Sequence, residues 1–266
     1  MTGPVVVGVD GSASSLAAVE IAAREADRRG VELRLAHALG PEPGEVAPGV
    51  PPWDPGGVDQ RDRVNGALGD AEWRARRVAP RVTITRGVLV GAPETVLGLE
   101  VRSASLAVLG SRHRSGLNGL LHGSVAGRLS ADGGCPVLVV CGRPALTGSV
   151  VLAYDASPAF RKAAEFAFAA AAERGTDLVV LSRRGTRAAR ALSDLREKYP
   201  DVVVRPHRVR GRAGRRLAEV SVGAQLIVVG VRRRGHGAVR VPRRSAGRKV
   251  LRYAHCPVVV VPGEKA

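Results

Sequence analysis

The sequence predicts an α/β protein of two tandem domains, each a doubly wound sheet of five parallel strands with helices on both faces. A chain of 266 residues is long enough for two domains of about 120 to 145 residues. The chain also repeats itself: Val5–Ser12 resembles Val150–Ser157, each ending in a serine that suits a helix N-cap, and both halves close on a Cys-Pro-Val run, at Cys135 and at Cys256. Finally, short β-branched runs alternate with helical patterns, which is typical of parallel sheets joined by right-handed helical crossovers.

The first half contains nine expected elements. They are strand Val5–Val9, helix Ser14–Arg29, strand Val31–Ala36, helix Val58–Val78, strand Val82–Thr85, helix Pro93–Arg102, strand Ser105–Leu109, helix Ser124–Ser130 and strand Val137–Val140. The first helix places Leu16, Val19, Ala23 and Ala26 on one face, and Gly30 is its expected C-cap. The Pro-rich stretch Gly40–Gly57 is predicted to be an extended surface loop.

The second half follows the same order with a shorter middle, in which Gly185–Tyr199 replaces the Pro-rich stretch and its helix. We therefore expect domains at residues 1–144 and 145–266, joined by the linker Arg143–Ser149. The last strands, Val137–Val140 and Val258–Val261, are expected at sheet edges. Because exposed apolar edges require a partner, we expect these strands to pair the two halves as a pseudo-dimer. The sequence leaves further homodimerisation open.

Positive charge is concentrated in the second half. Residues 1–144 carry 16 Arg against 15 Asp and Glu, a net charge of +1, whereas residues 145–266 carry 25 Arg and Lys against 9 acids, a net charge of +16. Neither a secretory signal nor an apolar run of about 18 residues is present. The three cysteines fit buried, reduced thiols better than a disulfide framework. We therefore expect a cytoplasmic protein.

A Gly-rich loop, Gly110–Ser124, follows a strand at the edge where parallel sheets bind ligands. Its backbone N–H groups could approach a phosphate closely. Gly123 and Ser124 stand at the start of the next helix, where unpaired N–H groups and the helix dipole favour anions. Arg112 and Arg114 could add charge-assisted bonds. On spacing alone, the loop fits a phosphate site or a structural turn equally well.

The loop is similar to the nucleotide loop of the universal stress protein family, Gly-x2-Gly-x9-Gly-Ser/Thr. Gly110 and Gly123-Ser124 fall at the matching spacing, and Val7–Ser12, Ala36-His37-Ala38 and Cys135-Pro136-Val137 also resemble the family. The similarity runs through essentially the whole chain, twice. It implies an adenine-nucleotide alpha-hydrolase-like fold that binds ATP or another adenine nucleotide, with Asp10 a candidate ligand for Mg²⁺ beside the phosphates.

The resemblance also implies a role for each matching residue. Asp10 and the backbone around Gly8 would contact the ribose or adenine, and Ala36 would contact the base through its main chain. The phosphates would lie on the loop; its expected nucleotide-binding residues are Gly110, Ser111, Arg112, His113, Gly116, Gly123, Ser124 and Val125. His113 stands where the family has its second Gly. An imidazole there would cost about 1 kcal/mol if φ must be positive, or it could bind phosphate itself; we expect weakened but retained binding.

The equivalent loop of the second half departs from this pattern. Arg233 and Arg244 stand where glycines are expected, and the loop from Gly230 to Ser245 is one residue longer. We therefore expect no ATP there. Between Arg205 and Arg252 there are 15 basic residues and one acid. The alternatives are a solvated charged surface and a site for a polyanion, such as nucleic acid, an anionic membrane surface or an acidic protein. The candidate polyanion-binding residues are Arg232, Arg233, Arg234, Arg243 and Arg244.

No catalytic set is evident in the sequence. The six histidines are scattered, and no spacing indicates a Ser-His-Asp arrangement or a metal site. The family resemblance includes members with feeble ATP hydrolysis and members that only bind. The sequence therefore predicts a stress-response protein that binds ATP through its first half, with polyanion binding by the second half as the alternative and weak ATP hydrolysis as the third.

Overall fold

The computed structural model describes most of the chain. The described residues are 3–40, 55–111, 125–132, 134–142, 145, 147–154, 157–182, 185–209, 213–231, 250–251 and 253–263. They fall into two compact units, Met1–Gly110 and Ser111–Ala266. The second unit therefore includes the last helix and strand of the first sequence repeat, and the domain boundary after Pro144 stays a prediction.

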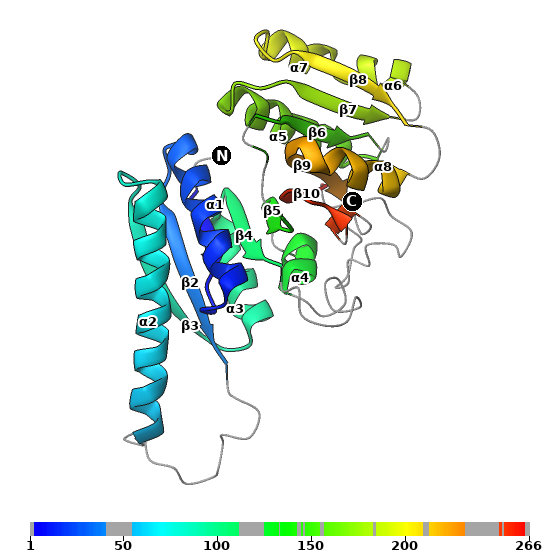
Figure 1. Cartoon of the computed structure of the whole chain (residues 1–266). Coiled ribbons are helices and arrows are strands. Elements are labelled where there is room, and N and C mark those ends of the chain that lie inside the picture. Colours follow the sequence, from blue (N-terminus) through cyan, green and yellow to red (C-terminus); the bar gives the residue numbers. More distant parts are fainter. Residues whose placement is uncertain are drawn as a thin grey trace. The chain divides into compact units, whose positions relative to one another are not determined.

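The first unit is a parallel sheet with the strand order β3-β2-β1-β4 (Figure 1). Its elements are β1 (Val5–Gly8), α1 (Ala13–Arg29), β2 (Leu33–Leu39), α2 (Pro55–Val78), β3 (Ile84–Val90), α3 (Pro93–Glu100), a 3₁₀ turn (Val101–Ser103) and β4 (Leu106–Gly110). The central strands β1 and β4 are almost wholly buried, because helices cover both faces of the sheet.

Two glycines show that α1 and α3 lie on opposite faces. A Cβ on Gly8 would lie 2.9 Å from Leu109 and 3.7 Å from Leu97 of α3. A Cβ on Gly110, the next residue after Leu109 along β4, would instead lie 2.3 Å from the Ser14 carbonyl oxygen of α1. Since successive residues of a strand face opposite sides, α3 covers one face and α1 covers the other.

Helix α1 is held as the sequence predicts. Its buried apolar residues recur every three or four positions, namely Ala18, Val19, Ala22, Ala23 and Ala26, which gives one face toward the sheet. Ser12 is the N-cap, and Gly30 ends the helix with φ of 62°. That left-handed conformation suits glycine because glycine has no Cβ.

The strand and helix bounds differ from the prediction in the middle of the first unit. β2 runs from Leu33 to Leu39 and β3 from Ile84 to Val90, so both extend further toward their carboxyl ends than expected. The β3 edge strand alternates half-buried and exposed residues and contains Gly87. Its sequence therefore has no continuous apolar run from which its full length could be predicted. α2 begins at Pro55, inside the predicted loop, because proline fits the first turn of a helix; the rest of that loop, residues 41–54, lies outside the described residues.

The second unit begins with the last helix and strand of the first repeat and continues with the elements of the second repeat. Its elements are α4 (Val125–Asp132), β5 (Val137–Val140), β6 (Ser149–Ala153), α5 (Phe160–Glu173), β7 (Leu178–Ser182), α6 (Gly185–Arg190), α7 (Ser193–Lys198), β8 (Val204–Arg208), α8 (Ala213–Val220), a 3₁₀ turn (Ser221–Gly223), β9 (Ala224–Val231) and β10 (Val258–Pro262). Strands β10-β9-β6-β7-β8 are all parallel. Two short helices, α6 and α7, occupy the shortened middle. The five-stranded parallel sheet predicted for the second half is confirmed.

The last strands of the two repeats pair with each other, as predicted. β5 and β10 run antiparallel, with Val258 opposite Val139 and Val260 opposite Val137. All four residues of β5 and all five of β10 are buried. Each strand therefore covers the apolar edge that the other would expose.

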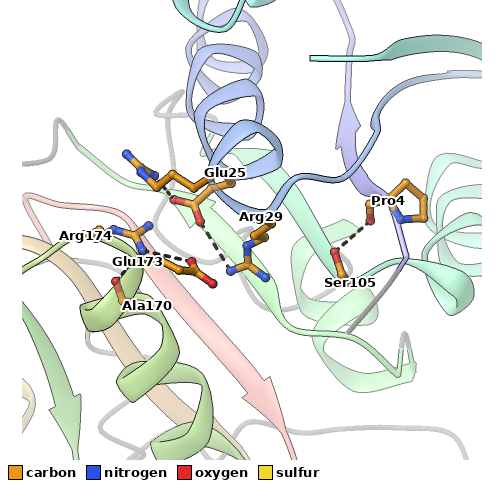
Figure 2. A network of polar contacts seen from close by, with 8 residues as sticks. Pro4, Glu25, Arg29, Ser105, Ala170, Glu173 and Arg174 are labelled. Atoms are coloured by element: carbon orange, nitrogen blue, oxygen red, sulfur yellow. Dashed lines mark hydrogen bonds and ion pairs between the residues drawn. The ribbon is translucent and has the colours of Figure 1, made fainter. Parts of the chain in front are cut away.

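Buried charge is compensated locally within each unit. In the first unit, Glu25 is only 2% exposed, and its carboxylate lies 2.7 Å from the Arg28 guanidinium. The same carboxylate lies 3.5 Å from the guanidinium of Arg29 (Figure 2). Figure 2 also shows the Ser105 hydroxyl donating to the Pro4 carbonyl at 3.3 Å. In the second unit, Arg174 donates to the Ala170 carbonyl at 2.9 Å.

None of the described helices is long and apolar enough to cross a membrane.

Candidate functional site

The candidate site lies where β1 and β4 end and α1 begins. Gly11 has φ of 76°, which allows the chain to turn from the strand into the helix. At Gly110 a Cβ would lie 2.3 Å from the Ser14 carbonyl oxygen. Only glycine fits so close an approach without a shift of the helix. These two glycines therefore bring the first turn of α1 directly against the end of β4.

A hydrogen-bond network fixes Asp10 beside this turn. The Asp10 carboxylate accepts from the Ser12 backbone N–H at 3.0 Å and from the Ser12 hydroxyl at 2.6 Å. The same hydroxyl accepts from the Ser15 backbone N–H at 3.2 Å, which is the N-cap bond of α1. The Ser15 hydroxyl donates to the Ser12 carbonyl at 3.0 Å and accepts from the Asp10 N–H at 3.3 Å. An exposed carboxylate is thus held in one orientation at the end of the helix that favours negative charge.

The structure brings four predicted residues together on three neighbouring strands or at their ends. Gly8 pairs with Ala36 of β2, Asp10 follows β1, and Gly110 ends β4 beside β1. Ala36 is fully buried, and its carbonyl accepts from the Val9 N–H at 2.9 Å. The sheet therefore already uses that oxygen, and the expected main-chain contact of Ala36 with a base stays a prediction.

Ser111 and Val125 lie in the second unit. The Ser111 side chain is buried, and its hydroxyl donates to the Val140 carbonyl at 2.6 Å; its backbone N–H donates to the same carbonyl at 3.2 Å. Ser111 therefore anchors the start of the loop to the end of β5. Val125 is the first residue of α4, one residue after the helix start expected at Ser124.

Several predicted residues lie outside the described part of the chain. They are Arg112, His113, Gly116, Gly123 and Ser124 of the first loop, and Arg232, Arg233, Arg234, Arg243 and Arg244 of the second. Their roles stay predictions.

His37 belongs to the site by position, although the sequence argument used it only as a flanking match. The β1–β2 register continues from Gly8 and Ala36 to place His37 beside Val9. His37 is half-buried, and its Nδ1 is buried without a hydrogen-bond partner among the described residues. Ser15, also overlooked, is buried and holds the Asp10 backbone. Two sequence features could have pointed to these residues: His37 lies near the end of a predicted strand, and Ser15 follows Ser12 in a Ser-x-x-Ser spacing.

The equivalent place in the second half is built differently. In the repeat, Tyr154 corresponds to Val9 and Phe160 to Ser15. The two rings pack edge-to-face, with centroids 4.6 Å apart and planes at 81°. α5 begins only at Phe160, after Ala159, and no side chain caps it, so the prediction that Ser157 is the N-cap is wrong. The bulky Phe160 ring stands where the first half has the Ser15 hydroxyl, which bonds the Ser12 carbonyl and the Asp10 N–H.

Two chemical classes of site can be assessed on the described residues. Among them, no three His, Cys, Asp or Glu side chains are grouped to hold a metal ion. The first half also places an oriented carboxylate and a helix N-terminus at the carboxyl ends of parallel strands, which is the edge where such sheets bind ligands.

The chain is similar to known proteins along both repeats. Residues 1–140 and 182–262 match the model of the universal stress protein family. The universal stress protein Rv2623 of Mycobacterium tuberculosis is 30% identical over 288 residues, which cover 96% of this chain and 95% of that protein. Rv1996 of the same organism is 32% identical over 306 residues, with 96% and 94% coverage.

A solved structure that covers almost the whole chain supports the fold. A universal stress protein from Archaeoglobus fulgidus DSM 4304 covers 98% of this chain and 96% of its own, with a TM-score of 0.77 at 20% identity. A universal stress protein in complex with cAMP matches 52% of this chain at 31% identity, with a TM-score of 0.41. From the family match over both repeats and the full-length relatives, the chain belongs to the universal stress protein family, in its tandem two-domain form.

Proposed function

We propose that the chain is a regulatory protein of the stress response that binds ATP or another adenine nucleotide through its first half. The observation that carries the proposal is the network in which Ser12 both caps α1 and orients the Asp10 carboxylate. This network stands at the carboxyl edge of a parallel sheet, beside Gly110, from which the Gly-rich loop departs. Membership of the universal stress protein family supports the same site.

In this proposal, different residues bind different parts of the nucleotide. The Asp10 carboxylate accepts hydrogen bonds, which suits ribose hydroxyls or Mg²⁺ near the phosphates. The loop from Gly110 to Ser124 ends at α4, whose N-terminus offers backbone N–H donors to phosphate oxygens. Bound Mg²⁺ would supply positive charge that offsets the triphosphate. Among the described residues of the second half no side chain caps α5, and the sequence has Arg233 and Arg244 where loop glycines are expected, so one nucleotide per chain is proposed.

Thermal unfolding in millimolar ATP tests this site. The wild-type chain is expected to gain thermal stability with ATP, because a ligand that binds only the folded state raises its melting temperature. Gly123→Arg and Asp10→Asn should lose most of that gain. Asp155→Asn, at the equivalent position in the second half, is the matched control and should keep it. If the wild-type chain shows no shift at millimolar ATP, the proposal fails.

A second candidate function is polyanion binding by the second half. It is favoured by the excess of 16 positive charges over residues 145–266 and by β8, where Arg205, His207 and Arg208 are all exposed. Backbone-directed nucleic-acid binding is the form that the composition supports, since such binding depends on charge rather than on aromatic stacking.

Retention on immobilised duplex DNA at increasing salt tests the second candidate. Retention by the wild-type chain should fall steeply with salt, and neutralising Arg232, Arg233 and Arg234 together should reduce it at every salt concentration. Replacing Arg74, Arg76 and Arg77 in the first half removes the same charge and is the matched control. Equal loss in both triple variants would point to net charge alone and would argue against a site in the second half.

A further inference from the structure

Two cysteines face each other beyond the end of the β5–β10 pairing. The antiparallel register sets Val139 opposite Val258 and Val137 opposite Val260. One further two-residue step sets Cys141 opposite Cys256. The neighbouring residue confirms that the strands stay together there, since a Cβ on Gly142 would lie 2.1 Å from the His255 carbonyl oxygen.

The two thiols share a buried environment. Cys141 is 7% exposed and Cys256 is fully buried, and the Cys141 thiol donates to the Leu251 carbonyl at 3.5 Å. Burial raises the pKa of each thiol to about 12, and the neighbouring Cys256 adds to the rise in the pKa of Cys141. Directly opposite residues in an antiparallel pair place their Cβ atoms about 4.5–5.5 Å apart, close to the distance that a disulfide requires.

The repeat makes two places in the β5–β10 pairing equivalent, and two cysteines lie opposite each other at only one of them. Cys135 corresponds to Cys256 in sequence, but the same register sets Cys135 opposite Pro262. Cys135 is also buried, so it offers an internal comparison: a cysteine of the same kind, in the same pairing, without a thiol opposite.

We propose that Cys141 and Cys256 form a reversible disulfide that links the last strands of the two repeats. The oxidant is a low-molecular-weight disulfide, RSSR. The Cys141 thiol loses its proton, and the thiolate attacks one sulfur of RSSR to give a mixed disulfide and a released thiolate, RS⁻. The Cys256 thiolate then attacks the Cys141 sulfur and releases the second RS⁻. The protein loses two hydrogens as protons and two electrons, and RSSR is reduced to two thiols.

The burial of the pair sets the rate of this reaction. Only the thiolate attacks a disulfide, and thiols whose pKa is about 12 are almost wholly protonated near neutral pH. Exchange in the folded chain is therefore slow, and its rate should rise about tenfold per pH unit below that pKa. The bond thus responds to lasting oxidation rather than to brief exposure.

The experiment equilibrates the full-length chain with mixtures of oxidised and reduced glutathione. In the oxidising mixture, the intact mass should fall by two hydrogen atoms, free thiols in the unfolded protein should fall from three to one, and a peptide linking Cys141 to Cys256 should appear. The cross-link should raise the melting temperature by about 5–10 °C. Cys135→Ser is the matched control and should still form the link, whereas Cys141→Ser and Cys256→Ser should not.

Because exchange in the folded chain is slow, the same mixture is also applied during refolding from denaturant. Absence of the Cys141–Cys256 peptide after both treatments would overturn the proposal. Cross-links that involve Cys135 equally would also overturn it, because they would reflect random pairing. A link that lowers the melting temperature would show that the folded strands do not accommodate the bond, and this too would count against it.

Discussion

At the scale of single residues, Gly110 determines how closely a helix can approach the candidate site. The Ser14 carbonyl of α1 lies so close to Gly110 that there is no room for a Cβ at this residue. The family resemblance predicts that Gly110 belongs to a phosphate loop, but its contact with α1 is a packing role that sequence spacing alone does not show. The same residue can serve both roles, since a missing side chain permits close approach on either side.

Gly110→Ala is expected to destabilise the chain by about 1–3 kcal/mol, the usual cost of overpacking. Denaturant unfolding measures the change. Gly69→Ala is the matched control: Gly69 lies within α2 with nothing near its would-be Cβ, so alanine there should stabilise by about 0.5–1 kcal/mol. Equal effects at the two sites would contradict the close approach of α1 to β4.

Ser12→Ala is expected to cost about 1 kcal/mol of stability, because it removes the N-cap of α1. It should also weaken ATP binding, since the Asp10 carboxylate loses its bond to the Ser12 hydroxyl. Calorimetric titration and denaturant unfolding measure the two effects. Ser12→Thr keeps the hydroxyl and should retain both properties. Unchanged ATP affinity in Ser12→Ala would separate the cap from the binding site.

At the scale of elements, the antiparallel pairing of β5 with β10 was predictable because both strands are short, wholly apolar runs in equivalent places. The Cys-Pro-Val repeat made that equivalence plain. The lengths of β2 and β3 were less predictable: His37 and Gly87 interrupt the apolar pattern, and an edge strand exposes one side to water. The late start of α5 was missed because Ser157 resembles a cap in sequence, whereas an aromatic pair occupies the turn.

Val259→Asp is expected to destabilise the chain by about 3 kcal/mol or more, because it buries an unpaired carboxylate between two strands. Val259 is fully buried opposite Leu138. Val90→Asp is the matched control, since Val90 of β3 is 80% exposed, and it should change stability by less than about 0.5 kcal/mol. Urea unfolding distinguishes the two; a tolerated Val259→Asp would mean that β5 and β10 do not pair in solution.

At the scale of the whole molecule, one fold serves two halves of different chemistry. The fold class, the repeat and the pairing of the last strands followed from apolar patterning, which burial enforces. The site followed only in part, because the hydrogen bonds of Ser15 depend on which strand ends meet in space, as does the His37 Nδ1, which has no partner among the described residues. The second half keeps the strands, but it has Phe160 where the first half has Ser15, and it carries more basic and fewer acidic residues.

The number of nucleotides bound per chain tests the central claim most directly, and isothermal titration of the full-length protein with ATP measures it. We predict one site per chain, abolished by Gly123→Arg and unaffected by Asp155→Asn. Two sites per chain, or a single site that survives Gly123→Arg and is lost in Asp155→Asn, would contradict the account.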